Sequence, residues 1–112
     1  MATEEIEKVL KYTESLFEKY GAVKTNFNIK KRMQFHERAI YIYKGEYYRL
    51  DAIQFNKKPF IVFEWIDDEN LAKVGVMEDG DSFPYDLPCE KIEKEVRFLF
   101  EIEPYPPNYP DY

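Results

Sequence analysis

The alternation of apolar and polar positions between residues 38 and 85 predicts the centre of the fold, an antiparallel sheet. Apolar residues recur at every second position in several short runs, which is the period of a strand with one buried face. Turn-forming pairs separate these runs at Lys44-Gly45, Lys57-Lys58 and Asp79-Gly80. The pattern therefore predicts a meander, in which each strand pairs with the next one along the chain.

The first turn sets the register, because a change of one residue in a turn moves the apolar side chains of a strand to its other face. A three-residue loop, Lys44–Glu46, would place Ile40 and Ile42 on the same face as Leu50. A two-residue turn would place them beside Arg49 instead. The first arrangement gives the more apolar face, so we expect the three-residue loop.

The same face can be followed through the rest of the sheet. A two-residue turn at Lys57-Lys58 sets Leu50 opposite Trp65. A four-residue loop at 67–70 and a hairpin at Asp79-Gly80 then predict a further strand that contributes apolar side chains to this face. Its members are Ala72, Val74 and Val76, with Val76 opposite Phe83.

The opposite face of the predicted sheet carries the candidate partner-binding residues, Tyr41, Tyr43, Tyr47 and Arg49. Tyrosine and arginine are enriched at binding hot spots, because they bury a large area and keep a polar group. The alternative is that the C-terminal helix or the tail covers this face. The same face carries an apolar patch that we expect the C-terminal helix to cover: Ile53, Phe55, Phe60 and Val62.

Helical spacing predicts two further elements. Apolar residues between Ile6 and Tyr20 fall within an arc of about 120°, with Thr3 as a cap and Gly21 as a stop. Residues 22–29 alternate as a strand. Residues 88–101 favour a helix, although the apolar alternation over residues 96–102 also fits a strand.

These elements predict an α+β fold with an antiparallel five- or six-stranded meander sheet, flanked by an N-terminal and a C-terminal helix. Residues 1–103 form a single α+β domain in this prediction. Residues 104–112 form an extended tail, because prolines at four of the last ten positions exclude a helix.

The charge distribution narrows the choice of partner. The formal net charge is −6, which argues against general nucleic-acid binding. Residues 1–60 contain 12 Lys and Arg against 8 Asp and Glu, whereas residues 61–112 contain 4 against 14. Such an asymmetry suits the steering of a basic protein partner, although an acidic, solvated surface has the same composition.

Cysteine content and hydropathy indicate the compartment. Cys89 is the only cysteine of the chain, so no intramolecular disulfide forms. No apolar run approaches the ~18 residues that a membrane span needs, and the charged N-terminus is unlike a signal peptide. We expect a cytoplasmic protein that does not bind a membrane.

No catalytic set, metal site or cofactor site is predicted. His36 is the only histidine, and we expect it to face solvent rather than to form a dyad with Cys89. The acidic segments at 67–69 and 78–81 fall at opposite ends of the predicted meander, so they serve as turns rather than as one site. The segment 106–109 fits the Pro-Pro-x-Tyr pattern read by WW domains, but we expect the tail to lie on its own sheet.

We therefore expect a non-enzymatic, acidic protein-interaction module. In size and composition the chain is similar to small acidic α+β proteins of bacteria and phages, which include immunity proteins that inhibit basic toxins. One alternative is a ligand-binding or enzymatic domain with a pocket near Tyr48, Gln54, Trp65 or Tyr85. A second alternative is a structural or homo-oligomeric phage or bacterial protein.

Overall fold

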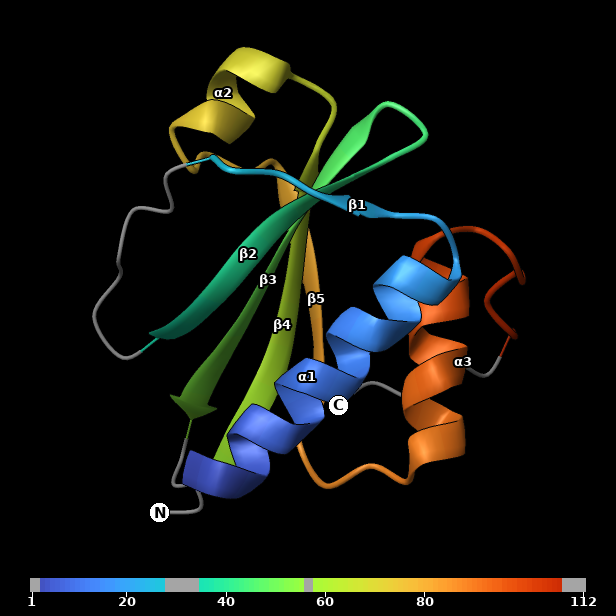
Figure 1. Ribbon diagram of the computed structural model, residues 1–112. Helices are drawn as coiled ribbons and strands as arrows, with labels where there is room; N and C mark the ends of the chain where they lie inside the picture. The colour runs from blue at the N-terminus through green and yellow to red at the C-terminus, as the bar shows by residue number, and fades with distance from the viewer. Residues whose placement is uncertain (1–2, 28–34, 56–57, 108–112) are drawn as a thin grey trace.

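In the computed structural model, which describes residues 3–27, 35–55 and 58–107, one five-stranded antiparallel sheet supports two long helices on one side (Figure 1). The strand order is β1-β2-β3-β4-β5, so each strand pairs with its neighbours in sequence. The elements are α1 (Thr3–Lys19), β1 (Val23–Lys24), β2 (Phe35–Tyr43), β3 (Glu46–Phe55), β4 (Lys58–Ile66), α2 (Glu69–Lys73), β5 (Asp79–Pro84) and α3 (Cys89–Leu99). The predicted α+β meander with a helix near each end of the chain is confirmed.

The helix α1 forms where the apolar stripe predicted it. Glu4 and Glu5 lie in its first turn, where carboxylates interact favourably with the positive end of the helix dipole. Ile6 and Phe17 are buried on its inner face. Gly21 follows the helix with a φ of 100°, a left-handed conformation that glycine adopts without steric cost.

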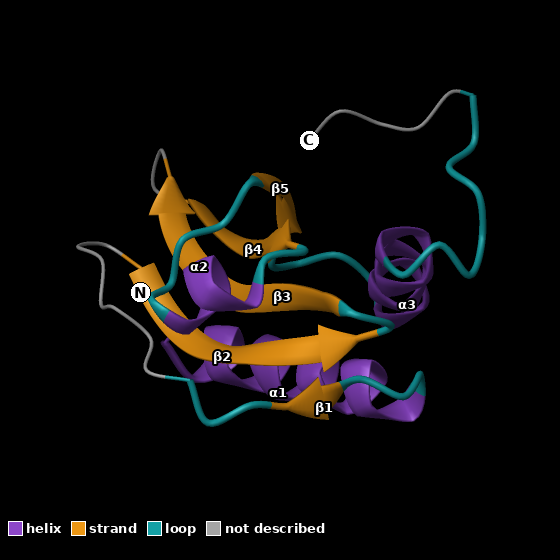
Figure 2. Ribbon diagram, turned by 90° about the horizontal axis from the view of Figure 1, so that it is seen from above, coloured by secondary structure: helices purple, strands orange, loops and turns teal. Residues whose placement is uncertain are grey.

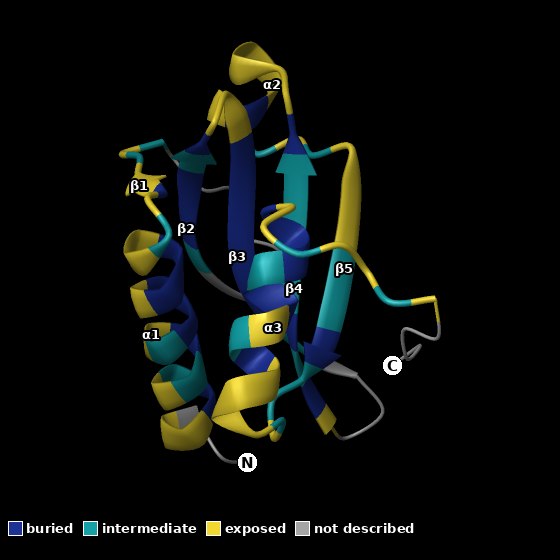
Figure 3. Cartoon of the chain, turned by 90° about the vertical axis from the view of Figure 1, so that its right-hand side faces the viewer, coloured by how far each residue is buried: buried dark blue, intermediate teal, exposed yellow. Residues whose placement is uncertain are grey.

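The main core lies between the two long helices and one face of the sheet, called the helix face below. Phe17 is fully buried at its centre, with its ring centroid 5.2 Å from that of Tyr41, 5.9 Å from Phe63 and 4.9 Å from Phe100. Figure 3 shows the buried sides of α1 and α3 turned towards the strands. The strands and both helices therefore share one hydrophobic core.

The predicted three-residue loop between β2 and β3 is wrong. Tyr43 pairs with Glu46, so the turn consists of Lys44 and Gly45 alone. Their φ angles are 49° and 81°. Positive φ at both central positions marks a type I′ turn, whose twist matches that of the strands it joins.

The shorter turn moves Ile40 and Ile42 away from Leu50, to the face opposite the long helices, called the outer face below. The expected common face is therefore wrong for β2. The physical reason is that the outer face has an apolar cluster of its own, in which Ile40 packs with Tyr47 of β3 and Ala72 of α2. Figure 2 shows the sheet from above, with α1 on one side of the strands.

The pairing of β3 with β4 keeps the predicted faces but shifts the partners by two residues. Leu50 opposes Phe63 rather than Trp65, and Trp65 opposes Tyr48. Because the shift is even, the apolar side chains of both strands still share the helix face.

The predicted strand through Ala72, Val74 and Val76 is also wrong. Residues 69–73 form the short helix α2, because the side chain of Asp68 caps it by accepting a hydrogen bond of 3.2 Å from the backbone N–H of Leu71. The chain then returns directly to the sheet as β5. This connection places α2 at one end of the sheet (Figure 1).

The pair Asp79-Gly80 therefore lies inside a strand rather than in a hairpin turn. Asp79 opposes Trp65, and Gly80 opposes Glu64. A Cβ atom added to Gly80 would lie 3.0 Å from the backbone oxygen of Phe63, so glycine allows a close approach between β5 and β4 here.

The first strand is shorter than predicted. Within residues 22–27, Val23 and Lys24 pair with β2, and Val23 is 62% exposed rather than buried. Thr25 continues the contact, because its backbone N–H and its hydroxyl both donate to the backbone oxygen of Ile40. Residues 28 and 29 of the predicted strand lie outside the described residues.

The helix α3 settles the choice left open for residues 96–102. Residues 96–99 are helical, and residues 100–102 form the turn that ends the helix. The tail is described only as far as Pro107, and it brings the ring of Tyr105 to 5.2 Å from that of Phe98. The rest of the predicted WW ligand lies outside the described residues.

Candidate functional site

The four predicted binding residues do not form one exposed patch. Tyr41 and Tyr43 lie on the helix face, whereas Tyr47 and Arg49 lie on the outer face. All four are buried, with exposed fractions of 0%, 8%, 8% and 1% in that order. The wrong turn length explains why the four residues are divided between two faces. The predicted three-residue loop placed Tyr41 and Tyr43 of β2 on the same face as Tyr47 and Arg49 of β3.

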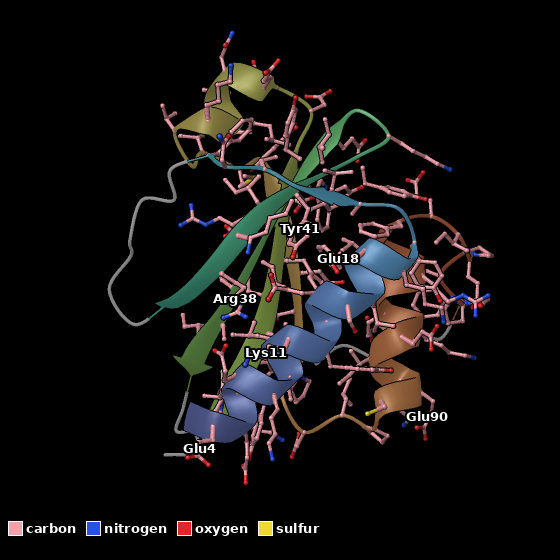
Figure 4. All side chains as sticks on the ribbon, in the orientation of Figure 1. Glu4, Lys11, Glu18, Arg38, Tyr41 and Glu90 are labelled. Atoms are coloured by element: carbon pink, nitrogen blue, oxygen red, sulfur yellow. The ribbon has the colours of Figure 1, made fainter. Side chains whose placement is uncertain are left out.

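Tyr41 takes part in a buried polar contact between β2 and α1. Its hydroxyl donates a hydrogen bond of 2.6 Å to Glu14, whose other carboxylate oxygen contacts Arg38. A register irregularity between Glu37 and Ala39 frees Arg38 from strand pairing and lets it reach α1, where it also contacts Glu7 at 2.6 Å. Figure 4 shows Arg38 and Tyr41 on β2 beside this helix.

The environment of Tyr41 indicates a structural role. Burial raises the pKa of its hydroxyl above the ordinary value, and the hydrogen bond to Glu14 acts in the same direction. Glu14 is itself only 8% exposed. The contact fixes α1 on the sheet and offers no open position for a ligand.

Arg49 forms a buried ion pair on the outer face. Its Nε atom lies 3.2 Å from a carboxylate oxygen of Asp51, and both side chains are almost fully buried. Its Nη1 atom donates a hydrogen bond of 2.9 Å to the backbone oxygen of Gly75. Arg49 therefore ties the centre of the sheet to the segment that follows α2.

The two acidic segments lie at the same end of the sheet, which corrects the prediction that they lie at opposite ends. Residues 67–69 follow β4 and lead into α2, whereas Glu78 and Asp79 return the chain to β5 beside Trp65. The prediction failed because the strand that was to separate them does not exist. Five of the six carboxylates of these two segments are exposed, and the sixth, Asp81, is half-buried.

The same connection exposes apolar side chains. Leu71 in α2 is 41% exposed, and Val74 and Val76, which follow the helix, are 60% and 47% exposed. Ala72 of α2 is fully buried. Together with the two acidic segments, these three residues define what we call the acidic end. Figure 3 shows the exposed surface of α2 beyond the ends of the strands.

A pocket of about 150 Å³ opens on the helix face at this same end. It lies where β3 begins and β4 ends, and α3 and the start of the tail form its other wall. The lining residues are Glu46, Tyr48, Trp65, Phe98, Leu99, Glu101 and Tyr105. We call this the terminal pocket.

Two tyrosines contribute polar groups to the terminal pocket. The hydroxyl of Tyr48 donates a hydrogen bond of 2.8 Å to Glu46, and burial with this bond raises its pKa above the ordinary value. Partial burial raises the pKa of Tyr105 to about 12, and the carboxylates of Asp81, Glu95 and Glu101 act in the same direction. Several carboxylates therefore lie near these two hydroxyls.

Glu101 reaches the terminal pocket from an unusual backbone conformation. It follows α3 with a φ of 59°, in the left-handed region. Its N–H donates to the oxygen of Phe98 at 3.1 Å, and the N–H of Ile102 donates to that of Arg97 at 2.9 Å. These two bonds define a Schellman motif, in which glycine usually occupies the position of Glu101.

Sequence reasoning located the terminal pocket only in part. Tyr48 and Trp65 line it, as the ligand-binding alternative expected, but Tyr85 packs against the main core instead. The side chain of Gln54 lies outside the described part of the chain. Glu101 and Tyr105 were missed, because only the course of the chain after α3 brings them to β3 and β4.

The remaining candidates, the cysteine, the histidine and the apolar patch, add no site to the described part of the chain. Cys89 is exposed at the start of α3, and the side chain of His36 lies outside the described residues. Ile53, Phe60 and Val62 are half-buried on the outer face, so the expected cover by α3 is wrong, because that helix packs on the helix face. The side chain of Phe55 is also outside the described residues.

No family model, curated protein or solved structure matches the chain. Within the described residues, no group of three or more His, Cys, Asp or Glu side chains is arranged to hold a metal ion. Among the same residues, no helix combines the length and apolar character needed to cross a membrane. The terminal pocket and the acidic end are therefore the features on which a functional argument is built.

Proposed function

We propose that the protein is a non-enzymatic interaction module that binds a basic protein through its acidic end. The observation that carries the proposal is the meeting of residues 67–69 with Glu78 and Asp79 around exposed Leu71, Val74 and Val76. Protein interfaces commonly combine an apolar centre with a charged rim. The acidic end has this composition.

The charges at the acidic end are predominantly negative. Lys73 is paired with Glu69 within α2 at 3.2 Å, which leaves a net negative charge on this connection. Such a surface speeds encounter with a positively charged partner, and the effect weakens as salt rises. A nuclease toxin is one class of basic protein that this surface would inhibit by covering its nucleic-acid site.

Charge-neutralising variants test the proposal. The double variant Asp67→Asn/Glu78→Gln removes two exposed charges from the acidic end and leaves the cap residue Asp68 in place. The matched control, Glu4→Gln/Glu90→Gln, removes two charges from the opposite end, where Figure 4 shows both residues. Each protein is immobilised and exposed to a native lysate, and captured protein is quantified at rising salt.

We expect the wild type and the control to capture a basic protein in stoichiometric amount, with capture falling as salt rises. The acidic-end variant should capture markedly less of the same protein. Equal capture by both variants, or capture that is indifferent to salt, would contradict a role for the acidic end.

The terminal pocket favours a second candidate, a binding protein for a small free ligand. Its volume of about 150 Å³ is below the roughly 300–1,000 Å³ typical of sites for drug-sized ligands. A ligand of this kind would have to be very small. Binding of a small molecule without any protein partner would favour this candidate over the first.

A further inference from the structure

We infer that the terminal pocket receives a lysine or arginine side chain of the basic partner. The inference rests on the proposed function, and it adds the specific group that the partner presents. Four aromatic residues and two carboxylates line the pocket, together with one leucine. This combination suits an organic cation, which aromatic faces attract electrostatically and carboxylates neutralise.

The size of the terminal pocket suits the end of one side chain. Its volume is about 150 Å³. A protein cavity of roughly 150 Å³ holds a molecule of benzene, which has six heavy atoms. The alkyl stem and charged head of a lysine or arginine have a similar number of heavy atoms, whereas a nucleotide or a folded peptide segment is too large.

The charge around the terminal pocket is negative on several sides. Glu46 and Glu101 line it from β3 and from the end of α3. Strand pairing adds Asp79 and Asp81, because they oppose Trp65 and Phe63 and so lie on the helix face. None of the seven lining residues is basic, so an entering cation meets no like charge among them.

The aromatic walls of the terminal pocket are held in place by contacts within the protein. Tyr48 is 4% exposed, and its hydrogen bond of 2.8 Å to Glu46 fixes the direction of that carboxylate. On the wall formed by α3 and the tail, Phe98 is 8% exposed and packs against Tyr105. A site whose groups are fixed beforehand loses little freedom when a side chain enters.

The backbone of Glu101 supports the inference independently. A non-glycine residue in the left-handed region is unfavourable, and a carboxylate at the negative end of a helix dipole is unfavourable as well. Unfavourable conformations of this kind occur often at functional sites. Glycine would relieve both costs, but only a longer acidic residue brings a charge into the pocket from this position.

Trp65 provides a direct measurement, because it lines the pocket and is the only tryptophan of the chain. Wild-type protein is titrated with N-acetyl-arginine amide and with N-acetyl-lysine amide while tryptophan fluorescence is recorded. The matched neutral probe is N-acetyl-citrulline amide, which has the shape of the arginine probe without its charge. The variant Glu46→Gln/Glu101→Gln is titrated in parallel, with Glu90→Gln as the control variant.

We expect both cationic probes to produce a saturable change, and the citrulline probe to produce none. The double variant should bind the cationic probes roughly tenfold more weakly, on the basis of about two- to fivefold for each exposed charge lost. Glu90→Gln should bind as the wild type does. Absence of saturation with both cations, equal binding of citrulline, or unchanged binding by the double variant would overturn the inference.

The two proposals fail in different ways. If the lysate experiment identifies a partner that needs the acidic end while the cationic probes do not bind, only the side-chain inference is wrong. If the cationic probes bind but no basic protein is captured, the pocket is a site for free cations and the proposed function is wrong. In that case the inference that the occupant belongs to a partner protein fails too.

Discussion

Replacement of Glu101 by glycine should stabilise the protein and weaken its binding of cations at the same time. Glu101 is the residue in the left-handed conformation of the Schellman motif that ends α3, with a φ of 59°. Its side chain also lines the terminal pocket. One substitution therefore tests whether a stability cost is retained there for function.

The expected magnitude follows from three contributions. Relief of the left-handed backbone gains about 1–2 kcal/mol, and removal of a carboxylate from the negative end of the helix dipole gains about 0.3–1 kcal/mol. The greater freedom of glycine in the unfolded chain loses about 0.4–1 kcal/mol. We expect a net gain near 1 kcal/mol in the free energy of unfolding, which raises Tm by about 4 °C in a domain of this size.

Urea denaturation followed by far-ultraviolet circular dichroism measures this gain. The comparison variant Glu101→Gln removes the charge but keeps the left-handed backbone of a non-glycine residue, so it should gain only about 0.3–1 kcal/mol. Both variants should lose the same charge-dependent part of the binding of N-acetyl-arginine amide. A Glu101→Gly protein that is less stable than wild type would refute the structural reasoning, and unchanged binding in both variants would refute the functional reasoning.

Three further predictions concern the fold. Asp51→Asn removes a buried carboxylate charge beside the guanidinium of Arg49, so it should lower the free energy of unfolding by about 3 kcal/mol in urea. The pKa of Tyr105 is raised from 10.0 to about 12, so the folded state keeps a proton that the unfolded chain loses near pH 10. Its contribution to stability should be complete below pH 10 and fall as pH rises from about 10 to 12, and Tyr105→Phe should remove this part of the decline in urea denaturation at alkaline pH. Lys44→Asn should stabilise the type I′ turn by about 0.5 kcal/mol, because asparagine tolerates positive φ better than lysine, and thermal unfolding would show no gain if the turn were of another type.

The helices could be predicted from sequence because each carries a complete local pattern. The apolar stripe from Ile6 onward, the early glutamates and Gly21 all favour one helix, and α1 has nearly those bounds. The sheet could also be predicted as a meander of short strands. In these elements local preference and tertiary packing agree.

The register of β2 could not be predicted because both faces of the sheet are covered. Alternation reveals a face only when the other side meets water. Here Ile40 packs against α2 on one side, while Tyr41 packs against α1 on the other. The correct turn places Arg49 on the apolar outer face, which the sequence disfavours, because the buried pairing of Arg49 with Asp51 cannot be read from the sequence alone.

The prediction of the chain path after β4 was wrong for a different reason. Asp79-Gly80 has the sequence of a hairpin turn, but here the glycine suits a close approach to β4, where an added Cβ would lie 3.0 Å from the backbone oxygen of Phe63. Asp68 is a helix cap that the sequence shows, although the acidic run around it is also typical of a loop. This error also hid the acidic end, because it separated two carboxylate segments that the fold brings together.

The terminal pocket shows the limit of sequence reasoning about function. Glu46, Trp65 and Glu101 are far apart in the chain, and no motif connects them. Only the shorter turn after β2 and the turn after α3 bring them to the same end of the sheet. A site assembled from three such elements becomes visible when the topology is known.

The most direct test of the account is a two-dimensional ¹H–¹⁵N spectrum of the labelled protein titrated with a short arginine-rich peptide. Binding at this end should shift the indole N–H of Trp65 and the backbone amides of Glu46, Glu78 and Glu101, and these shifts should diminish as salt rises. Amides in the first turn of α1, at the opposite end, should not move. Shifts confined to α1, or no shifts at any peptide concentration, would contradict the claim that this end of the sheet binds a basic partner.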